Sequence, residues 1–188
     1  MLSFFGLISG LLACISHIPY LIDILKGTTK PERASWLIWL VLGSISFFSQ
    51  MAKGATDSLW LVGGDTLGTV LTFILAIKFG VGGLAKRDLV SLAFAFLGLV
   101  LWFFTKEPLT ALIIVILVDF AGAILTVIKS YEDPGSETLA TWVLCSIAGF
   151  FAVLSVGEFN LILLLYPLYL CFINGATAVV ILVGRRKS

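Results

Sequence analysis

Titratable side chains lie within long apolar stretches of the sequence: the aspartates Asp65 and Asp119 and the only histidine, His17. An aspartate at the centre of a membrane span costs about 2.5–3.5 kcal/mol on insertion scales, so an acid at such depth is a functional candidate. Histidine titrates near neutral pH, and a carboxylate neighbour favours its charged form. We predict that Asp119 and His17 face each other across a central cavity, where they hold or pass a proton. Hydrogen bonds to neighbouring helices or to backbone carbonyls are the structural alternative.

Other polar and aromatic residues in the apolar stretches are candidates for contacting a solute. Asp65 and Thr72 lie in one stretch, and Asn174 lies in the last one. An asparagine both donates and accepts hydrogen bonds, which suits a hydroxylated solute, and Trp39 offers a ring for stacking. We predict that these four residues bind a solute. Packing between helices, which small and hydroxyl residues also serve, remains the alternative.

Two prolines interrupt apolar stretches, Pro19 in the first and Pro167 in the last. A proline inside a helix removes one backbone hydrogen bond and crowds the carbonyl four residues earlier, which kinks the helix. Kinks beside a midplane site are natural places for a gate to hinge. We therefore predict that Pro19 and Pro167 are gating hinges, although prolines are also common in membrane helices that do not move.

The scaffold that must position these residues is predicted to be embedded in a membrane. The chain has 188 residues, of which 60% are apolar and 12% charged, and its mean hydropathy is +1.11. These values exclude a soluble domain. The apolar stretches are continuous, which argues against a membrane β-barrel, and a net charge of +1 gives no case for nucleic-acid binding. The predicted fold is all-α and polytopic, with seven transmembrane helices near 2–24, 34–52, 59–80, 89–105, 109–130, 138–156 and 161–183.

The basic residues predict the orientation of these spans. Cytoplasmic connections carry an excess of lysine and arginine. Lys53 and Lys106 fall on one side, and the other ten basic residues fall on the opposite side. We therefore expect the N-terminus outside and the C-terminus in the cytoplasm, most simply in the plasma membrane of a cell. The ten are Lys26, Lys30, Arg33, Lys78, Lys86, Arg87, Lys129, Arg185, Arg186 and Lys187.

The first and last three spans resemble each other, which predicts an internal repeat. Each half has a lysine at the end of its first span, a proline in the following turn, and a hydroxyl residue directly before a tryptophan, Trp36 or Trp142. Within the flanking spans, an offset of 102 residues (119 minus 17, or 174 minus 72) superposes His17 on Asp119 and Thr72 on Asn174. Both copies start on the same side, so they are expected to be parallel repeats related by an axis along the membrane normal. The predicted division is residues 1–80, a linker helix within 81–108, and residues 109–188 with a short basic tail.

This order of spans resembles the PQ-loop and SWEET superfamily, which includes sugar transporters, amino-acid exporters and the KDEL receptor. The resemblance covers nearly the whole chain by topology and about 20 residues by motif. Tyr20 stands where that family has glutamine, and Gly122 lies near where its second proline would be. The residues that carry it are Pro19-Tyr20-Leu21, Asp23, Lys26 and Ser35-Trp36. The resemblance implies two parallel three-helix bundles and a solute pocket lined by the third and seventh spans.

These observations predict a membrane transporter for a small polar solute, sugar-like or another small metabolite, that works by alternating access. The sequence leaves open whether transport is coupled to protons, through Asp119 and His17, or is facilitated diffusion. A receptor or adaptor on the same fold is the alternative, and an ion channel is a third. No pattern of an enzyme, a metal site or a cofactor site is present, and Cys14, Cys145 and Cys171 do not predict disulfides. The expected partners are the solute and the lipid bilayer. The sequence leaves a homo-oligomer open.

Overall fold

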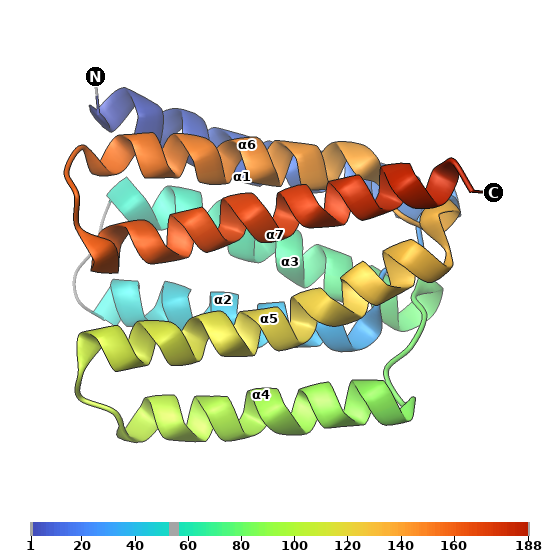
Figure 1. The fold of residues 1–188 in the computed structure, drawn as a ribbon, viewed down its shortest axis with the longest axis horizontal. Helices are drawn as coiled ribbons and strands as arrows, with labels where there is room; N and C mark the ends of the chain where they lie inside the picture. Colours follow the sequence, from blue (N-terminus) through green and yellow to red (C-terminus); the bar gives the residue numbers. More distant parts are fainter. Residues whose placement is uncertain (1, 53–56, 188) are drawn as a thin grey trace.

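The computed structural model describes the backbone of residues 2–52 and 57–187, and the side chains in these ranges except at 49, 50, 52, 57–62 and 108. Within them the chain is helical, without a β-strand, and the helices lie lengthwise side by side (Figure 1). Their bounds lie within a few residues of the predicted spans. The helices are α1 (Leu2–Leu25), α2 (Arg33–Ala52), α3 (Asp57–Phe79), α4 (Lys86–Phe104), α5 (Pro108–Glu132), α6 (Leu139–Val156) and α7 (Leu161–Arg185), with a single 3-10 turn, η1 (Pro134–Ser136), before α6.

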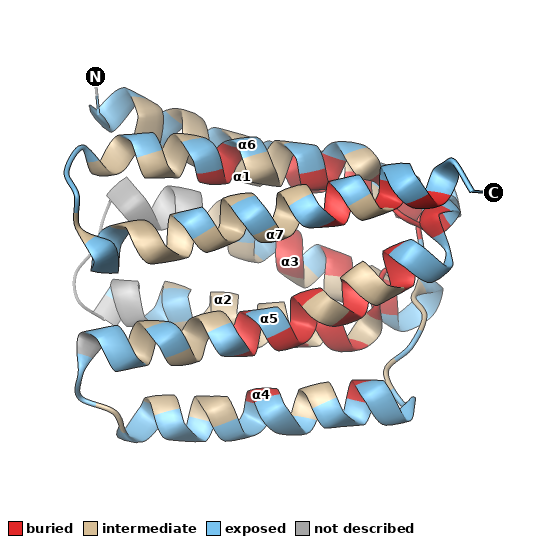
Figure 2. Ribbon diagram, viewed as in Figure 1, coloured by how far each residue is buried: buried red, intermediate tan, exposed pale blue. Residues whose placement is uncertain are grey.

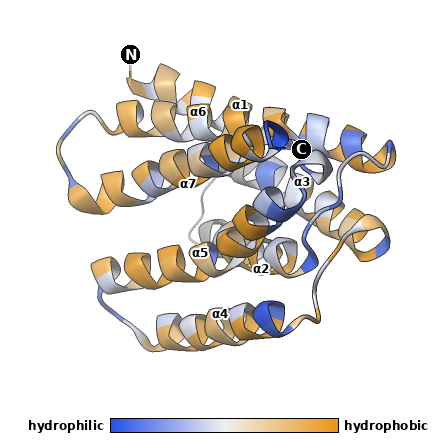
Figure 3. Cartoon of the chain, turned by 45° about the vertical axis from the view of Figure 1, so that its right-hand side comes forward, coloured by the Kyte–Doolittle hydropathy of each residue, from blue (hydrophilic) through white to orange (hydrophobic). Residues whose placement is uncertain are grey.

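Five of these helices are long and apolar enough to cross a bilayer: α1, α4, α5, α6 and α7. In α2, the apolar described part is the shorter segment Arg33–Phe48. Large apolar side chains are exposed along the outside of the bundle, among them Phe103, Phe104 and Phe172, each more than 70% exposed. Hydrophobic residues also dominate the helices in Figure 3, and the hydrophilic ones concentrate towards the helix ends. A surface of this kind is stable in lipid and not in water.

Local sequence explains several helix ends. Pro108 occupies the first turn of α5, where its missing N–H costs nothing. The side chain of Asn160 caps α7 by accepting hydrogen bonds from the backbone N–H groups of Ile162 and Leu163, at 3.1 and 3.3 Å. Gly157 ends α6 with a φ of 72°, the left-handed conformation that glycine adopts without strain.

The helices of the two halves follow one packing order. In the first half α3 contacts both α1 and α2, and in the second half α7 contacts both α5 and α6. Across the middle of the bundle, α1 packs on α6 and α2 packs on α5. Helix α4 lies on the outside against α5 and α2, as Figure 1 shows for α5. Val118 and Ala121 of α5, Ile38 of α2 and Ala95 of α4 form the buried cluster that holds it.

The two ends of the bundle differ in burial. We define the basic end as the end that contains the C-terminus and the connections 26–32, 80–85 and 133–138, and the opposite end as the one that contains the N-terminus and the connections 105–107 and 157–160. Buried residues concentrate towards the basic end (Figure 2). The ten basic residues that the sequence assigned to one side lie at this end, whereas Lys106 lies at the opposite end and Lys53 is outside the described residues. The tightly packed end of the bundle is therefore also the cationic end.

The two candidate hinge prolines lie inside helices that continue past them. Pro19 is inside α1 and Pro167 is inside α7. Neither is among the residues that line the cavity described below. Gating at these two positions stays a prediction.

Candidate solute cavity

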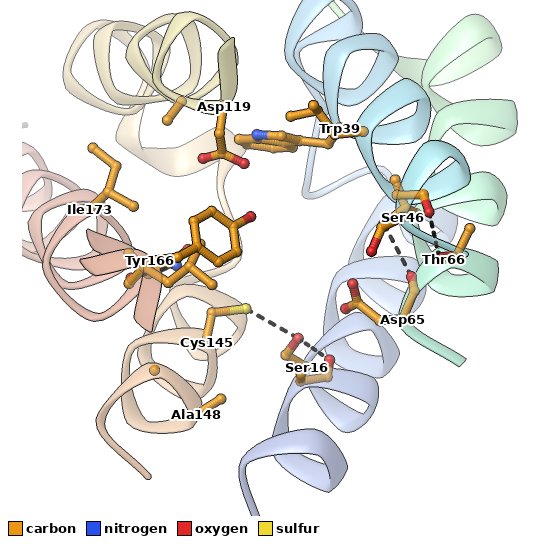
Figure 4. Close-up of a pocket in the computed structure, with 18 of the residues that line it drawn as sticks. Ser16, Trp39, Ser46, Asp65, Thr66, Asp119, Cys145, Ala148, Tyr166 and Ile173 are labelled. Carbon is orange, nitrogen blue, oxygen red and sulfur yellow. Dashed lines mark hydrogen bonds between the residues drawn. The ribbon is translucent and has the colours of Figure 1, made fainter. Parts of the chain in front are cut away.

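A cavity of about 620 Å³ lies between the two halves of the bundle. All seven long helices contribute to its lining, and α4 contributes only Leu99 and Trp102. Small-molecule sites usually enclose about 300–1,000 Å³, so the space suits a metabolite. Figure 4 shows some of its polar and aromatic side chains pointing inwards from opposite walls.

Five of the residues predicted from the sequence line this cavity: His17, Trp39, Asp65, Asp119 and Asn174. Thr72 does not belong to the lining. It is fully buried, and its hydroxyl donates a 2.8 Å hydrogen bond to the carbonyl of Gly68 one turn earlier in α3. The side chain of Thr72 therefore lies where the packing alternative placed it.

His17 is paired with Asp65 and not with Asp119. Its Nε2 lies 3.1 Å from Oδ1 of Asp65, a half-exposed carboxylate on the neighbouring helix α3. Gly68 makes room for the imidazole, because a Cβ at that position would lie 2.4 Å from the ring. Within the described part of the chain, no hydrogen bond or ion pair joins His17 to Asp119. The two residues share the cavity but have different partners.

Asp119 lies on the wall formed by the second half. It is 7% exposed, and the hydroxyl of Tyr169 donates a 2.6 Å hydrogen bond to its Oδ2. Figure 4 shows its carboxylate pointing towards the space between the rings of Trp39 and Tyr166. Gly122, one turn after Asp119, leaves space for the indole of Trp39, since a Cβ there would lie 3.2 Å from Nε1. An acid and two aromatic rings therefore meet at one place in the cavity.

Aromatic residues from three helices close the cavity towards the basic end. The ring centroids of Trp36 and Trp39 are 5.2 Å apart, those of Tyr20 and Trp36 are 5.0 Å apart, and Trp142 lies about 6 Å from Tyr20 and Trp39. Tyr20 is fully buried, and Trp36 and Trp142 are nearly so. Below them Ile24 and Ile181 complete the same buried cluster. This buried cluster lies between the cavity and the basic end.

A buried ion pair supports the aromatic layer from the basic end. The Nζ of Lys129 lies 2.6 Å from a carboxylate oxygen of Glu137. The same carboxylate accepts hydrogen bonds from Nε1 of Trp142 at 2.9 Å and from the hydroxyl of Tyr20 at 3.2 Å. The indole Nε1 of Trp36 donates to the Tyr20 hydroxyl at 3.3 Å. We call Tyr20, Trp36, Lys129, Glu137 and Trp142 the basic-end network, and it joins both halves of the chain.

The pairing of Lys129 with Glu137 was not predicted from the sequence. Lys129 entered the prediction only as one of the basic residues that set the orientation of the spans. The spacing of residues in the polar connection does not show that Glu137 accepts a hydrogen bond from Trp142. One feature of the sequence does set these residues apart. A glutamate stands shortly before each of two tryptophans, Glu32 before Trp36 and Glu137 before Trp142. A glutamate at a similar place in both connections is a signal that could have identified these residues.

The connections at the basic end are also tied to each other. The hydroxyls of Thr29 and Thr138 are 2.6 Å apart, and Thr138 donates to Asp23 at 2.9 Å. At the other end the cavity lining reaches Ser9 of α1, Ser46 of α2 and Ala152 of α6, where most of the described residues are half-buried or exposed. Buried and hydrogen-bonded residues therefore cover the cavity at the basic end, and its lining extends towards the opposite end.

No protein-family model, curated protein or solved structure matches this chain. Among the described residues, no group of three or more His, Cys, Asp or Glu side chains is arranged to hold a metal ion. Within the part of the chain that the structure describes, Cys14, Cys145 and Cys171 form no disulfide. The lining of the cavity includes the carboxylates of Asp65 and Asp119, the imidazole of His17, the thiol of Cys145 and aromatic rings.

Proposed function

We propose that this chain is a membrane transporter that moves a small polar solute by alternating access between two three-helix repeats, residues 1–80 and 109–188, joined by a linker helix within 81–108. The observation that carries the proposal is the cavity between the halves, covered at one end by a network to which both halves contribute. A transporter must be able to close either end of its path, and this arrangement has the form of a state closed at the basic end.

The packing order supports the repeat. The third helix of each half contacts the other two. In the proposed repeat α1 corresponds to α5 and α2 corresponds to α6. The contacts of α1 with α6 and of α2 with α5 are therefore the same contact made twice. Parallel repeats related by an axis along the membrane normal produce this pattern. On this basis we propose that α2 and α3 also span the membrane, that the basic end faces the cytoplasm, and that the fold is of the PQ-loop and SWEET type.

Transport is tested with the full chain in liposomes, with sugars, amino acids and vitamin precursors offered with and without a pH gradient. We expect uptake of at least one solute, and we expect Asp119→Asn to abolish or uncouple it while the protein stays folded. Full proton-driven uptake by this variant would refute the role of Asp119 in coupling. Specific binding without uptake would favour the receptor on the same fold, and uptake that does not saturate would favour a channel.

Alternating access is tested by cysteine labelling from each side of the membrane. Ala152 lines the cavity near the opposite end, and Ala178 is buried near the basic end, so Ala152→Cys and Ala178→Cys are matched variants in a background without native cysteines. We expect an impermeant maleimide to label the first position and spare the second until solute is added. Labelling of both positions regardless of solute would contradict a gated path.

A further inference from the structure

The charged side chains that line the cavity are mainly acidic. Its lining contains Asp65, Asp119 and His17, and no lysine or arginine is among the described residues that form it. Asp65 has His17 at 3.1 Å as a potential counter-charge. The hydrogen-bond partner of Asp119 is the neutral hydroxyl of Tyr169. A carboxylate buried in this way without a cation is costly, so the cavity favours a ligand that brings a positive charge.

Many of the neutral polar groups of the lining already donate hydrogen bonds within the protein. Six side chains give a hydroxyl or amide hydrogen to a backbone carbonyl of their own or a neighbouring helix, at 2.6–3.1 Å. These six are Ser9, Ser16, Thr69, Thr141, Asn174 and Thr177. A sugar needs both donors and acceptors around its ring, whereas an ammonium group needs only acceptors and aromatic faces. The five hydroxyl groups among these six therefore offer a ligand their oxygen lone pairs rather than their hydrogens, which favours an ammonium-type ligand.

The aromatic rings lie where such a charge would rest. The carboxylate of Asp119 points to the space that Trp39 and Tyr166 flank (Figure 4), and the rest of the lining is mostly apolar. Cations bind to the faces of tryptophan and tyrosine, and the attraction grows when water is excluded. Trp36 and Trp142 extend the aromatic surface towards the basic end. An amine attached to a flat apolar body would satisfy the acid and the rings together.

We infer that the solute is an organic cation with an aromatic or other flat apolar body, bound with its ammonium group between Asp119, Trp39 and Tyr166. This inference rests on the proposed transport function for its role in the cell, but it concerns binding and is tested separately. It selects a cationic metabolite from the classes that the sequence left open, and it disfavours a sugar.

The test measures binding to the purified full chain by titration calorimetry at neutral pH, with empty micelles subtracted. The probes are benzyltrimethylammonium, whose charge is fixed, benzyl alcohol as a neutral aromatic of similar shape, and glucose. We expect the cation to bind at least tenfold more tightly than either neutral compound. Equal binding of benzyl alcohol, or tighter binding of glucose, would overturn the inference.

Variants locate the site. Asp119→Asn is expected to weaken cation binding at least tenfold, Asp119→Glu to retain most of it, and Trp39→Leu to weaken it severalfold. Asp133→Asn, which removes an exposed carboxylate at the basic end, is the matched control and should leave binding unchanged. If Asp119→Asn fails to fold, Trp39→Leu still decides the question. Cation binding that neither variant weakens would overturn the site.

Uptake into liposomes separates the two proposals. A cation that binds at Asp119 but is not transported would leave this inference intact and contradict the transporter. Uptake of a neutral solute by a protein that does not bind the cation would leave the transporter intact and contradict this inference.

Discussion

The connections that lead into α2 and α6 each bury a glutamate shortly before a tryptophan, yet they stabilise it in different ways. Glu32 and Glu137 are both 2% exposed. Glu137 faces the ammonium group of Lys129 at 2.6 Å and also accepts hydrogen bonds from Trp142 and Tyr20. Its negative charge is therefore matched by a full positive charge, and both of its oxygens have partners.

Among the described residues, none forms an ion pair with Glu32. Its Oε2 accepts a 2.6 Å hydrogen bond from the backbone N–H of Ser35, and its Oε1 is buried without a hydrogen-bond partner. Burial raises the pKa of Glu32 above the ordinary glutamate range, and the nearby negative charge of Asp88 raises it further. Glu32 thus takes up a proton more readily than an exposed glutamate does.

The hydroxyl of Ser35 fits a protonated Glu32. Its Oγ lies 2.6 Å from the carbonyl of Gly122, 2.9 Å from the hydroxyl of Thr126 and 2.8 Å from Oε2 of Glu32. A hydroxyl has one hydrogen to donate, and the carbonyl can only accept. If Ser35 donates to Gly122, then Oε2 of Glu32 needs its own proton to bond with Ser35. The two glutamates therefore differ in their partners: Glu137 belongs to an ion pair, whereas Glu32 is held by Ser35 and has a pKa that burial raises.

The largest expected effect comes from breaking the ion pair. Glu137→Gln leaves Lys129 buried without a counter-charge, and removing one partner of such a pair costs about 3–5 kcal/mol. We expect the basic end to open, so that Cys at position 178 is labelled from that side, and the unfolding midpoint in detergent to fall. Glu32→Gln is the matched control, which removes no ion pair and should do neither.

A double variant sharpens the same point. Lys129→Met with Glu137→Leu replaces both charges by apolar side chains of similar length, which is often close to neutral for a buried pair. We expect most of the lost stability to return. A double variant as unstable as Glu137→Gln would show that the hydrogen bonds to Trp142 and Tyr20, and not the ion pair, hold the basic end together.

A smaller effect is expected at Tyr20, whose hydroxyl donates to Glu137 and accepts from Trp36. Tyr20→Phe leaves the ring in place but removes one partner from two buried polar groups, at a cost of about 1–3 kcal/mol. Its effect should be less than additive with that of Glu137→Gln, because both changes break the same network. Unfolding in urea, measured for both single variants and the double variant, gives the coupling. Full additivity would place Tyr20 outside the network.

The helix bounds could be predicted because they depend on the length of apolar stretches and on the charges, prolines and glycines between them. The partner of His17 could not. An offset within a repeat gives the depth of a residue but not which helix lies beside it, and α3 lies beside α1, so Asp65 reaches the imidazole first. Thr72 shows a related limit, because spacing does not tell whether a hydroxyl turns into a cavity or back to its own helix.

The different partners of Glu32 and Glu137 also could not be predicted from the sequence. Both are acids before a tryptophan, and the lysine that neutralises Glu137 lies on the far side of η1, whose turn brings the two together. In the first half the corresponding connection instead lies against residues 81 and 82, where Gly82 has a φ of 70° and a Cβ would lie 2.1 Å from Oε1 of Glu32. Tertiary contacts, and not the motif, decide the partners of each acid.

The smallest expected effect is the contribution of Glu32 to the pH dependence of the protein's stability. Because its pKa is raised in the folded protein, the folded state binds this proton more tightly than the unfolded state. The resulting stabilisation is fully present below the unfolded pKa of glutamate and is lost as the pH rises through the raised value. Glu32→Gln cannot lose a proton, so the unfolding midpoint of the wild type should fall relative to that of this variant as the pH increases.

The measurement is the difference in midpoint between wild type and Glu32→Gln from about pH 4 to about pH 8, a range that brackets the usual glutamate values. Glu158→Gln is the control, because Glu158 is exposed and its difference from wild type should stay flat. A Glu32→Gln difference that is equally flat would mean that Glu32 keeps one charge state throughout. The two glutamates would then differ in their partners but not in their response to protons, and the cavity aspartates would be the place to look for proton coupling.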